Sequence, residues 1–214
     1  AYEMSASLVG SEMCIRDIAY KDACRRLGKA NVLLTEKTEY LFPAEGSTQQ
    51  KHPTVIVGMG PAGLFCGYYL AQHGYAPVIL ERGADVDARQ ADVEAFWQTG
   101  RLKPDSNVQF GEGGAGTFSD GKLNTLVKDK YGRNTEVLKT FVKHGADLAI
   151  LYQAKPHIGT DVLSKVVKSM REEILRMGGE VRFHSQMTEI LTENGQVTGV
   201  KVNGTEVLPC EQVV

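Results

Sequence analysis

The feature that most constrains the fold is a β-branched run that leads directly into a glycine-rich turn. Residues 54–57 read Thr-Val-Ile-Val, which is typical of a parallel strand buried on both faces. Residues 58–63 follow as Gly-Met-Gly-Pro-Ala-Gly. A helix is predicted over 61–72 and a second buried strand over 77–80, which completes a strand–helix–strand unit of about 30 residues. The pattern therefore predicts an α/β domain with a parallel sheet.

The turn has the Gly-x-Gly-x-x-Gly spacing of a dinucleotide-binding loop, in the strand–turn–helix context that such a loop requires. Gly58 permits the tight turn, and Gly60 lets the backbone approach a pyrophosphate without a Cβ in the way. Gly63 lets the helix pack closely on the strand. Pro61 and Ala62 open the helix, whose free N–H groups favour an anion. We therefore expect a pyrophosphate at this turn.

An acidic residue closes the second strand. Glu81 lies 18 residues after Gly63, where a carboxylate can accept hydrogen bonds from a ribose. NAD-binding domains end this strand in an acid as well, so Glu81 by itself does not distinguish FAD from NAD(P).

Four short β runs near the end of the chain bear on that choice. They are predicted over 180–184, 188–191, 197–202 and 205–208, and Asn-Gly pairs at 194–195 and 203–204 favour tight hairpin turns. Glu81-Arg82-Gly83 and the run 187–208 resemble the FAD-binding domain of glutathione-reductase-like flavoproteins, in which the sheet carries an antiparallel β-meander. This resemblance implies FAD contacts from Glu81, Arg82 and Arg89, and it places the backbone of Met187 at the adenine.

A second glycine cluster, residues 107–124, carries Phe110, Phe118 and Leu123 among its glycines. It is either a flexible surface loop or backbone brought against a flat, charged cofactor. Residues 113–123, Gly-Gly-Ala-Gly-Thr-Phe-Ser-Asp-Gly-Lys-Leu, and 155–161, Lys-Pro-His-Ile-Gly-Thr-Asp, resemble signature stretches of a family of bacterial FAD-dependent dehydrogenases. The resemblance extends over about residues 18–214. It implies FAD contacts near the pyrophosphate and the flavin from these residues: Gly113, Gly114, Ala115, Gly116 and Thr117.

Three further helices are predicted from their apolar spacing. Helix 85–97 places Val86, Val93, Phe96 and Trp97 on one face, and helix 134–144 turns Val137, Leu138, Phe141 and Val142 inward. Helix 161–177 has an apolar stripe of Leu163, Val166, Val167, Met170, Ile174 and Met177, with Lys165, Lys168, Arg171 and Glu172 away from it.

No catalytic residue is assigned from the sequence. His157 either donates a proton near a flavin or, as the favoured alternative, is partly buried and hydrogen-bonds its turn. Ser119, Asp120 and Lys122 either contact substrate or cap the next turn, and both alternatives stay open. Cys66 faces the core or the sheet without a partner cysteine, which disfavours a redox disulfide. The other histidines are isolated: His52, His73, His144 and His184.

Composition excludes several other classes of protein. Lys and Arg total 24 against 26 Asp and Glu, so the net charge of −2 gives no basic stripe for nucleic acid. No apolar run reaches the roughly 20 residues of a membrane helix, and no signal peptide is recognisable. The four cysteines form no CxxC pair, so we expect no metal site, no disulfide framework and a reducing, cytoplasmic setting.

The chain divides into three parts in this interpretation. Residues 5–17 resemble translated sequencing-adapter sequence, so 1–17 is set aside as extraneous. Residues 18–52 form an extension with a helix over 18–28, strands over 31–34 and 39–42, and a linker over 43–53. The FAD-binding domain spans 53–214, with an inserted segment at 84–160. Val213 and Val214 begin another apolar run, so we expect the domain to be truncated here.

The expected fold is a Rossmann-like α/β domain, with helices on one face of a parallel sheet and a β-meander on the other. The expected function is that of an FAD-dependent oxidoreductase, of which this chain is the N-terminal part. Its small-molecule substrate and its electron donor or acceptor are unidentified. Two alternatives stay open, a flavin- or NAD-binding scaffold or tRNA-modifying module, and an NAD(P)-dependent dehydrogenase.

Overall fold

The computed structural model describes residues 3–8, 11–15, 25–26, 32–35, 38–43, 46–119, 121–123, 125, 127–153 and 155–214. Its contacts divide the chain into two compact units, which we describe separately. One unit comprises 44–120 and 163–214, and the other comprises 1–43 and 121–162. No helix in the described ranges is both long enough and apolar enough to cross a membrane.

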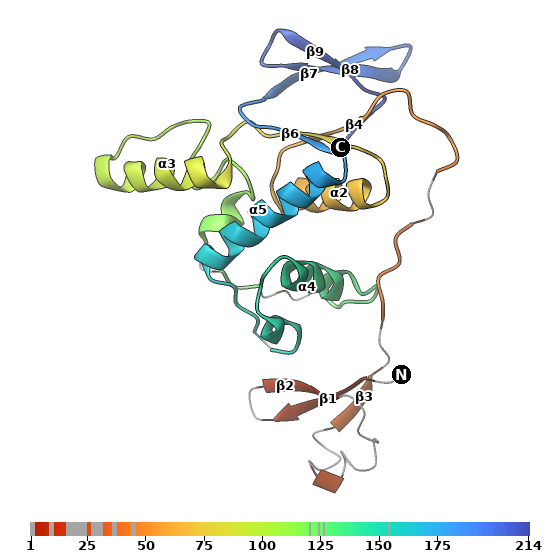
Figure 1. Cartoon of the computed structure of the whole chain (residues 1–214), viewed down its shortest axis with the longest axis vertical. Helices are drawn as coiled ribbons and strands as arrows, with labels where there is room; N and C mark the ends of the chain where they lie inside the picture. Colours follow the sequence, from red (N-terminus) through yellow and green to blue (C-terminus); the bar gives the residue numbers. More distant parts are fainter. Residues whose placement is uncertain are drawn as a thin grey trace. The chain divides into compact units, whose positions relative to one another are not determined.

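The unit of 44–120 and 163–214 is built on a four-stranded parallel sheet in the order β10-β4-β5-β6. Its strands are β4 (Thr54–Val57), β5 (Val78–Leu80), β6 (Glu180–Arg182) and β10 (Gln212–Val213). Helix α2 (Pro61–Gln72) and helix α5 (Thr160–Arg176) lie on one side of this sheet, and a small antiparallel sheet lies on the other (Figure 1). The predicted fold class, with helices on one face and a meander on the other, is confirmed.

Alternate side chains of β4 and β5 supply the cores on the two faces of the sheet. Val55, Val78 and Leu80 form one buried cluster with Val200 and Val202 of the small sheet. Ile56 and Ile79 point to the opposite face, towards α2. A Cβ at Gly67 of α2 would lie 2.4 Å from Cδ1 of Ile79 and 3.6 Å from Cδ1 of Ile56. The continuous apolar runs therefore reflect strands that are buried on both faces.

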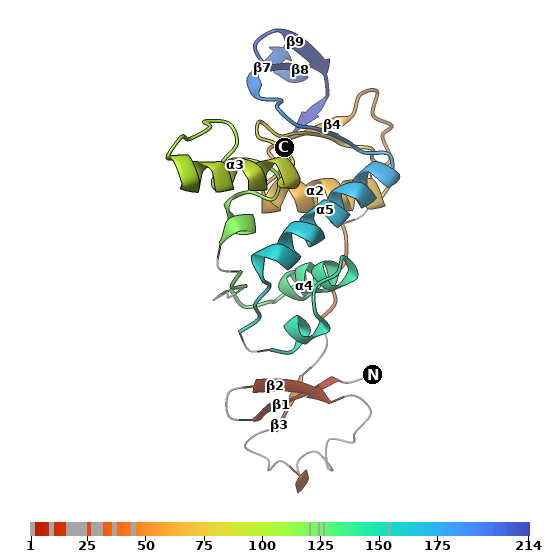
Figure 2. The ribbon, with the colours of Figure 1, turned by 60° about the vertical axis from the view of Figure 1, so that its left-hand side comes forward.

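The small sheet is the predicted meander, with strand order β7-β8-β9 and antiparallel pairing (Figure 2). Its strands are β7 (Met187–Glu193), β8 (Gln196–Val202) and β9 (Glu206–Pro209). Asn194 and Gly195 between the first two strands have φ of +51° and +78°, and Asn203 and Gly204 repeat these values. Both turns therefore have the left-handed conformation that the Asn-Gly pairs predicted.

Helix α3 (Val86–Thr99) agrees with the prediction at its start and differs at its end. Asp85 caps the helix by accepting hydrogen bonds from the N–H groups of Asp87 and Ala88. Val86 and Val93 are buried, but 66% of Trp97 is exposed, so the residues expected on one helix face do not share one buried environment. The helical spacing is right, but no described residue covers the last turn of the helix at Trp97.

The unit of 1–43 and 121–162 contains a three-stranded antiparallel sheet in the order β2-β1-β3. Its strands are β1 (Glu3–Leu8), β2 (Ser11–Ile15) and β3 (Val32–Thr35), and the first two lie within the segment that the sequence analysis sets aside. Residues 38–43 are irregular, so the strand predicted over 39–42 is wrong. Of the helix predicted over 18–28, only Arg25 and Arg26 lie among the described residues, and both are helical.

The same unit contains α4 (Arg133–Lys143) and the short 3₁₀ helix η3 (Leu148–Leu151). No side chain at the N-cap position caps α4, because Gly132 occupies it. Asp129 instead accepts hydrogen bonds from the N–H groups of Asn134 and Thr135 at 3.0 and 2.9 Å. Phe141 is the most buried of the four side chains predicted to face inward, and the other three are half-buried.

Candidate functional site

The first glycine turn leaves the start of α2 open. Gly58 has a φ of +92°, a conformation that strongly favours glycine, and its N–H donates to Leu80 O at 2.7 Å. Gly60 is the N-cap of α2 and has ordinary extended backbone, with Pro61 as the first helical residue. No side chain caps this helix and no acidic residue lies in its first turn. The first N–H groups therefore remain available to an anion.

Two glycines of this turn differ in what surrounds them. A Cβ at Gly63 would lie 1.9 Å from Gly58 O, so Gly63 is required for α2 to pack against the turn. A Cβ at Gly60 would meet no atom within 4 Å. Packing within the described residues therefore explains the glycine at 63 but not the glycine at 60.

The second glycine cluster lies directly against the first. Gly113 N–H donates to Met59 O at 2.8 Å. A Cβ at Gly114 would come within 3.1 Å of both Gly60 Cα and Pro61 Cδ. Two segments about fifty residues apart in the sequence thus meet at the N-terminus of α2. Ala115 and Gly116 are exposed in the short 3₁₀ helix η2 (Ala115–Phe118), and Thr117 is buried.

Glu81 connects the first turn to the loop after β5. Only 5% of this residue is exposed. One carboxylate oxygen accepts from Met59 N–H at 2.7 Å and the other from Gly83 N–H at 2.8 Å. Both oxygens therefore already position backbone of the candidate site, and the ribose contact of Glu81 stays a prediction.

Arg89 is fully buried and organises the second cluster. Its guanidinium donates to the backbone oxygens of Asn107, Val108 and Glu112 at 2.7–2.8 Å. Desolvation lowers the pKa of Arg89 to about 10, although the charges of Glu81 and Glu112 oppose this shift. The cofactor contact expected of Arg89 stays a prediction, and the structure shows the side chain holding protein carbonyls.

A buried acid that the sequence analysis did not single out completes this arrangement. Glu112 is fully buried; one oxygen accepts from Val86 N–H and the other from Nε of Arg171, both at 2.7 Å. Burial raises the pKa of Glu112, and the hydrogen bond from Val86 and the charge of Arg171 oppose this effect. Arg171 is not among the buried residues of the α5 stripe, as expected, but its side chain is only 16% exposed because it pairs with Glu112.

Arg82 lies beside the same loop. Its guanidinium carbon lies 3.9 Å from the centroid of the Phe110 ring, and its Nη2 contacts Pro104 O and the Asp105 carboxylate. Met187, at the start of β7, is half-buried against the Val200 and Val202 cluster. The cofactor contacts of Arg82 and Met187 stay predictions.

The polar residues near the end of the second cluster have different surroundings. Ser119 Oγ donates to Gly116 O at 2.8 Å, which favours the capping alternative for this residue. Asp120 lies outside the described residues. In the unit of 121–162, Lys122 forms an isolated antiparallel bridge with His157. The two stretches that resemble the dehydrogenase family therefore pair with each other through their backbones.

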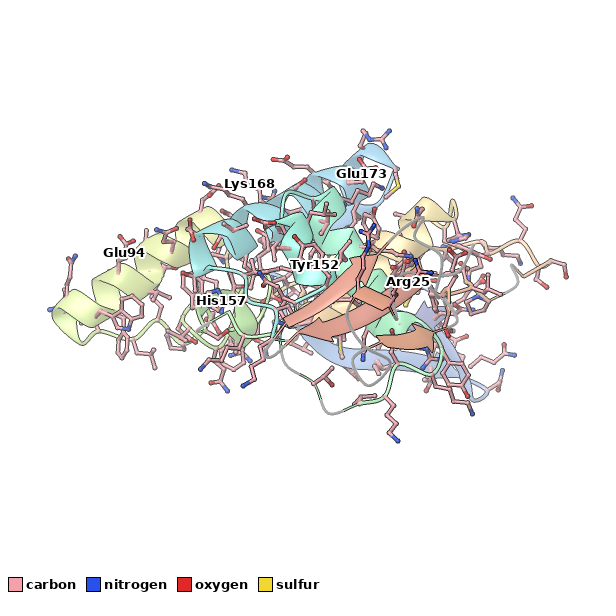
Figure 3. The ribbon with its side chains drawn as sticks, turned by 90° about the horizontal axis from the view of Figure 1, so that it is seen from below. Arg25, Glu94, Tyr152, His157, Lys168 and Glu173 are labelled. Atoms are coloured by element: carbon pink, nitrogen blue, oxygen red, sulfur yellow. The ribbon has the colours of Figure 1, made fainter. Side chains whose placement is uncertain are left out.

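His157 does not have the environment that the favoured alternative predicted. Its side chain is exposed rather than partly buried (Figure 3). The backbone pairing around it, Leu123 N–H to Pro156 O at 3.0 Å and Ile158 N–H to Gly121 O at 2.9 Å, explains the position of the residue. Its role as a proton donor stays a prediction.

The remaining candidate residues show no catalytic arrangement in the described part of the chain. Cys66 and Cys210 are unpaired, and burial raises the pKa of the Cys66 thiol, which disfavours its reactive thiolate form. No group of three or more His, Cys, Asp or Glu side chains among the described residues is placed to hold a metal ion.

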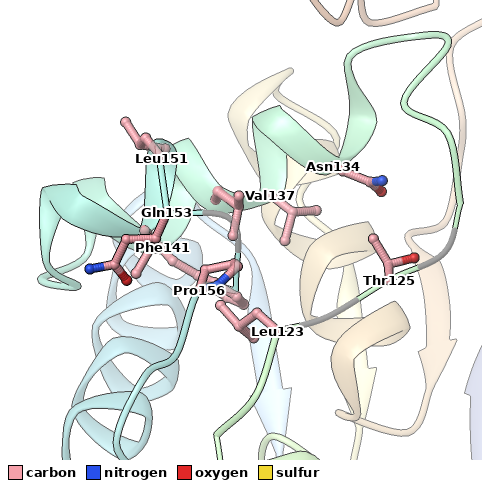
Figure 4. Close-up of a pocket in the computed structure, with 10 residues that line it drawn as sticks. Leu123, Thr125, Asn134, Val137, Phe141, Leu151, Gln153 and Pro156 are labelled. Atoms are coloured by element: carbon pink, nitrogen blue, oxygen red, sulfur yellow. The ribbon is translucent and has the colours of Figure 1, made fainter. Parts of the chain in front are cut away.

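A pocket of about 420 Å³ lies in the unit of 1–43 and 121–162, and Leu123 of the second glycine cluster is one of its lining residues (Figure 4). Most of the described lining is apolar, and none of the described lining side chains is ionisable. The lining residues are Leu123, Thr125, Asn134, Val137, Leu138, Phe141, Ile150, Leu151, Gln153 and Pro156.

Comparison with known proteins supports the assignment of the first turn. Residues 56–102 match the NAD(P)-binding Rossmann-like domain family. An uncharacterized protein of Clostridium beijerinckii is 50% identical over 189 residues, which are 88% of this chain and 35% of that protein. The chain thus spans about a third of the length of this relative.

Solved structures with a similar fold are more distant in sequence. THI4 of Thermovibrio ammonificans is 20% identical with a TM-score of 0.46, and the match covers 76% of this chain and 55% of that one. Glycine oxidase of Bacillus cereus is 16% identical with a TM-score of 0.40, over 76% and 54% of the two chains. The topology shows a Rossmann-like α/β domain, and residues 56–102 are similar in sequence to the NAD(P)-binding family of that fold.

Proposed function

We propose that this chain is the dinucleotide-binding part of an FAD-dependent oxidoreductase. The observation that carries the proposal is the open face at Gly60. There a Cβ would meet nothing, no side chain caps α2, and Gly114 of the second cluster contacts the same turn. The resemblance of both glycine segments to flavoproteins selects FAD among the dinucleotides.

The residues present fit such a cofactor. The first N–H groups of α2, at Ala62 and Gly63, suit the pyrophosphate, and the uncluttered backbone at Gly60 permits its approach. Glu81 lies at the end of β5, on the side expected for the adenosine ribose. The exposed Ala115 and Gly116 extend from the turn as the segment expected nearer the flavin. When bound, FAD would supply hydride or electron transfer, and the protein would bind and orient it.

The complete protein that contains this chain tests the proposal. Purified, it is expected to be yellow and to release FAD on denaturation. A colourless protein that added FAD fails to reconstitute would contradict the assignment. The substrate and the second redox partner are unidentified small molecules in this proposal.

Gly60→Val tests the site itself. The new side chain would occupy space that no protein atom fills, so we expect at least a ten-fold loss of bound FAD with little change in the thermal stability of the FAD-free protein. Gly46→Val is a matched control, because Gly46 is exposed and a Cβ there also meets no atom within 4 Å. Equal FAD content in the two variants would show that Gly60 does not face the cofactor.

A second candidate function is favoured by the sequence match, since the matching family is described as NAD(P)-binding. In that case the chain belongs to an NAD(P)-dependent dehydrogenase without flavin. Saturable binding of NADH or NADPH to a colourless protein, lost in Gly60→Val, would support this candidate over FAD.

A further inference from the structure

We propose that the unit containing 121–162 holds a second ligand site, the pocket beside α4, which takes a small, uncharged and mainly apolar molecule. The volume of about 420 Å³ lies in the range of small-molecule pockets, which is about 300–1,000 Å³. This site is additional to the dinucleotide site and is built from other residues.

The walls of the pocket are apolar. Phe141 and Ile150 are 9% and 2% exposed and belong to its most buried part. Val137 and Leu138, on the same helix as Phe141, line it while remaining half-buried. An apolar molecule bound here would bury this surface, which stabilises the complex by about 25 cal/mol of free energy per Å² of apolar area removed from water.

The polar groups of the pocket lie at its two ends. Figure 4 shows Thr125 and Asn134 together at one end and Gln153 at the other. Asn134 Nδ2 donates to Val127 O at 3.3 Å, and Thr125 Oγ1 accepts from Val127 N–H at 3.1 Å. The Thr125 O–H and the Asn134 carbonyl oxygen retain capacity for a ligand. The arrangement suits an apolar body with a neutral hydrogen-bonding group.

Charge excludes other classes of ligand. A charged group brought into this pocket would lose its hydration and find no ionic partner among the ten described lining side chains, because none of them is ionisable. An anion or cation is therefore expected to bind much more weakly than a neutral molecule of the same shape.

Backbone contacts fix one wall of the pocket. Leu123 N–H donates to Pro156 O at 3.0 Å, and both residues line the pocket. The pairing needs Gly121, where a Cβ would lie 1.8 Å from Ile158 O. The wall thus consists of two paired segments whose register is set by a close glycine contact.

The test uses the complete protein and three probes that share one apolar chain: 1-octanol, octanoate and octyltrimethylammonium. Calorimetry and ligand-observed NMR are expected to show saturable binding of 1-octanol, at least about ten-fold tighter than either ion. Absence of saturable 1-octanol binding would overturn the site. Equal or tighter binding of either ion would overturn the proposed ligand class.

Two variants locate the binding. Val137→Phe fills the pocket from α4, and Gln153→Trp fills it from an exposed position that folding tolerates; each is expected to weaken 1-octanol binding at least ten-fold. Leu41→Phe is the matched control, since Leu41 is 83% exposed and is not among the residues that line the pocket. If Val137→Phe fails to fold, Gln153→Trp decides. Undiminished binding in a folded pocket variant would refute the proposal, whether or not the protein holds FAD.

Discussion

The two glycine-rich segments that meet at α2 owe their conformations to different forces. In the first, residues 58–63, a strand, a turn and a helix follow one another, and local geometry determines the path. In the second, side chains from other elements hold the backbone: Arg89 of α3 binds its carbonyls and Arg171 of α5 binds Glu112. The first segment is a local motif, whereas the second requires the surrounding fold.

Their glycines also serve different purposes. In the second segment, Gly111 and Gly113 are crowded, because a Cβ would lie 2.5 Å from Arg89 Cδ and 2.1 Å from Thr117 Oγ1. In the first, Gly63 is crowded but Gly60 is not. In the two segments, a Cβ would meet no atom within 4 Å at Gly58, Gly60 and Gly116. The positive φ of Gly58 accounts for its glycine, so Gly60 and the exposed Gly116 remain as the better indicators of space for a ligand.

Arg89→Met would break the second segment and is expected to have the largest effect. It leaves the buried carbonyl oxygens of Asn107, Val108 and Glu112 without their donor, which costs about 3–5 kcal/mol of unfolding free energy. Denaturant unfolding followed by circular dichroism measures this loss.

Arg101→Met is the control for that variant, because Arg101 is exposed. It is expected to change stability by less than about 0.5 kcal/mol. Similar stabilities for the two variants would show that Arg89 does not hold the second segment.

Gly63→Ala and Gly60→Ala separate packing from ligand space within the first segment. The Cβ at 63 would meet Gly58 O at 1.9 Å, so the backbone must shift, at a cost of about 1–3 kcal/mol. The Cβ at 60 meets nothing, and a change below about 0.5 kcal/mol is expected. Thermal unfolding of both variants without added cofactor makes the comparison. An equal loss in both would contradict it.

Glu112→Gln tests the ionic connection to α5 and is expected to cost about 1 kcal/mol at neutral pH. The amide oxygen can still accept from Val86 N–H, but the NH2 group cannot accept from Nε of Arg171, so the variant removes both the charge and the acceptor that face Arg171.

The pH dependence of this variant has a definite sign. Because burial raises the pKa of Glu112, the folded state keeps its proton to a higher pH than the unfolded state does. The stability of the wild type relative to Glu112→Gln should therefore fall as pH rises from the ordinary titration range of a glutamate through this raised pKa. A difference that instead grows over this range would show that Arg171 and Val86 outweigh desolvation.

The sequence predicted the elements of the sheet unit closely, because their patterns are local. The strand at 54–57 and the helix at 61–72 have the predicted bounds, and the meander strands deviate by at most two residues. β-branched runs, a helix-opening proline and Asn-Gly turns act over a few residues, so they can be recognised without the fold.

Predictions of side-chain burial that depended on contacts with distant residues were less accurate. Trp97 has the spacing of an inward residue, but no described residue covers it. Arg171 has the spacing of an outward residue, but Glu112 draws it into a buried ion pair. Periodicity shows which side chains share a face of a helix, and it does not show where the neighbouring elements end or which partner a charge finds.

The sequence alone determined the α/β class, the dinucleotide turn and the importance of both glycine clusters, because each is written in residues that lie next to one another. Only the tertiary structure showed that the clusters meet at the start of α2. It also showed that the Arg89 and Glu112 side chains hydrogen-bond to the protein backbone. Only the structure showed that no packing contact requires a glycine at position 60. These properties depend on which atoms lie within a few ångströms of one another across tens of residues, and a linear pattern does not contain that information.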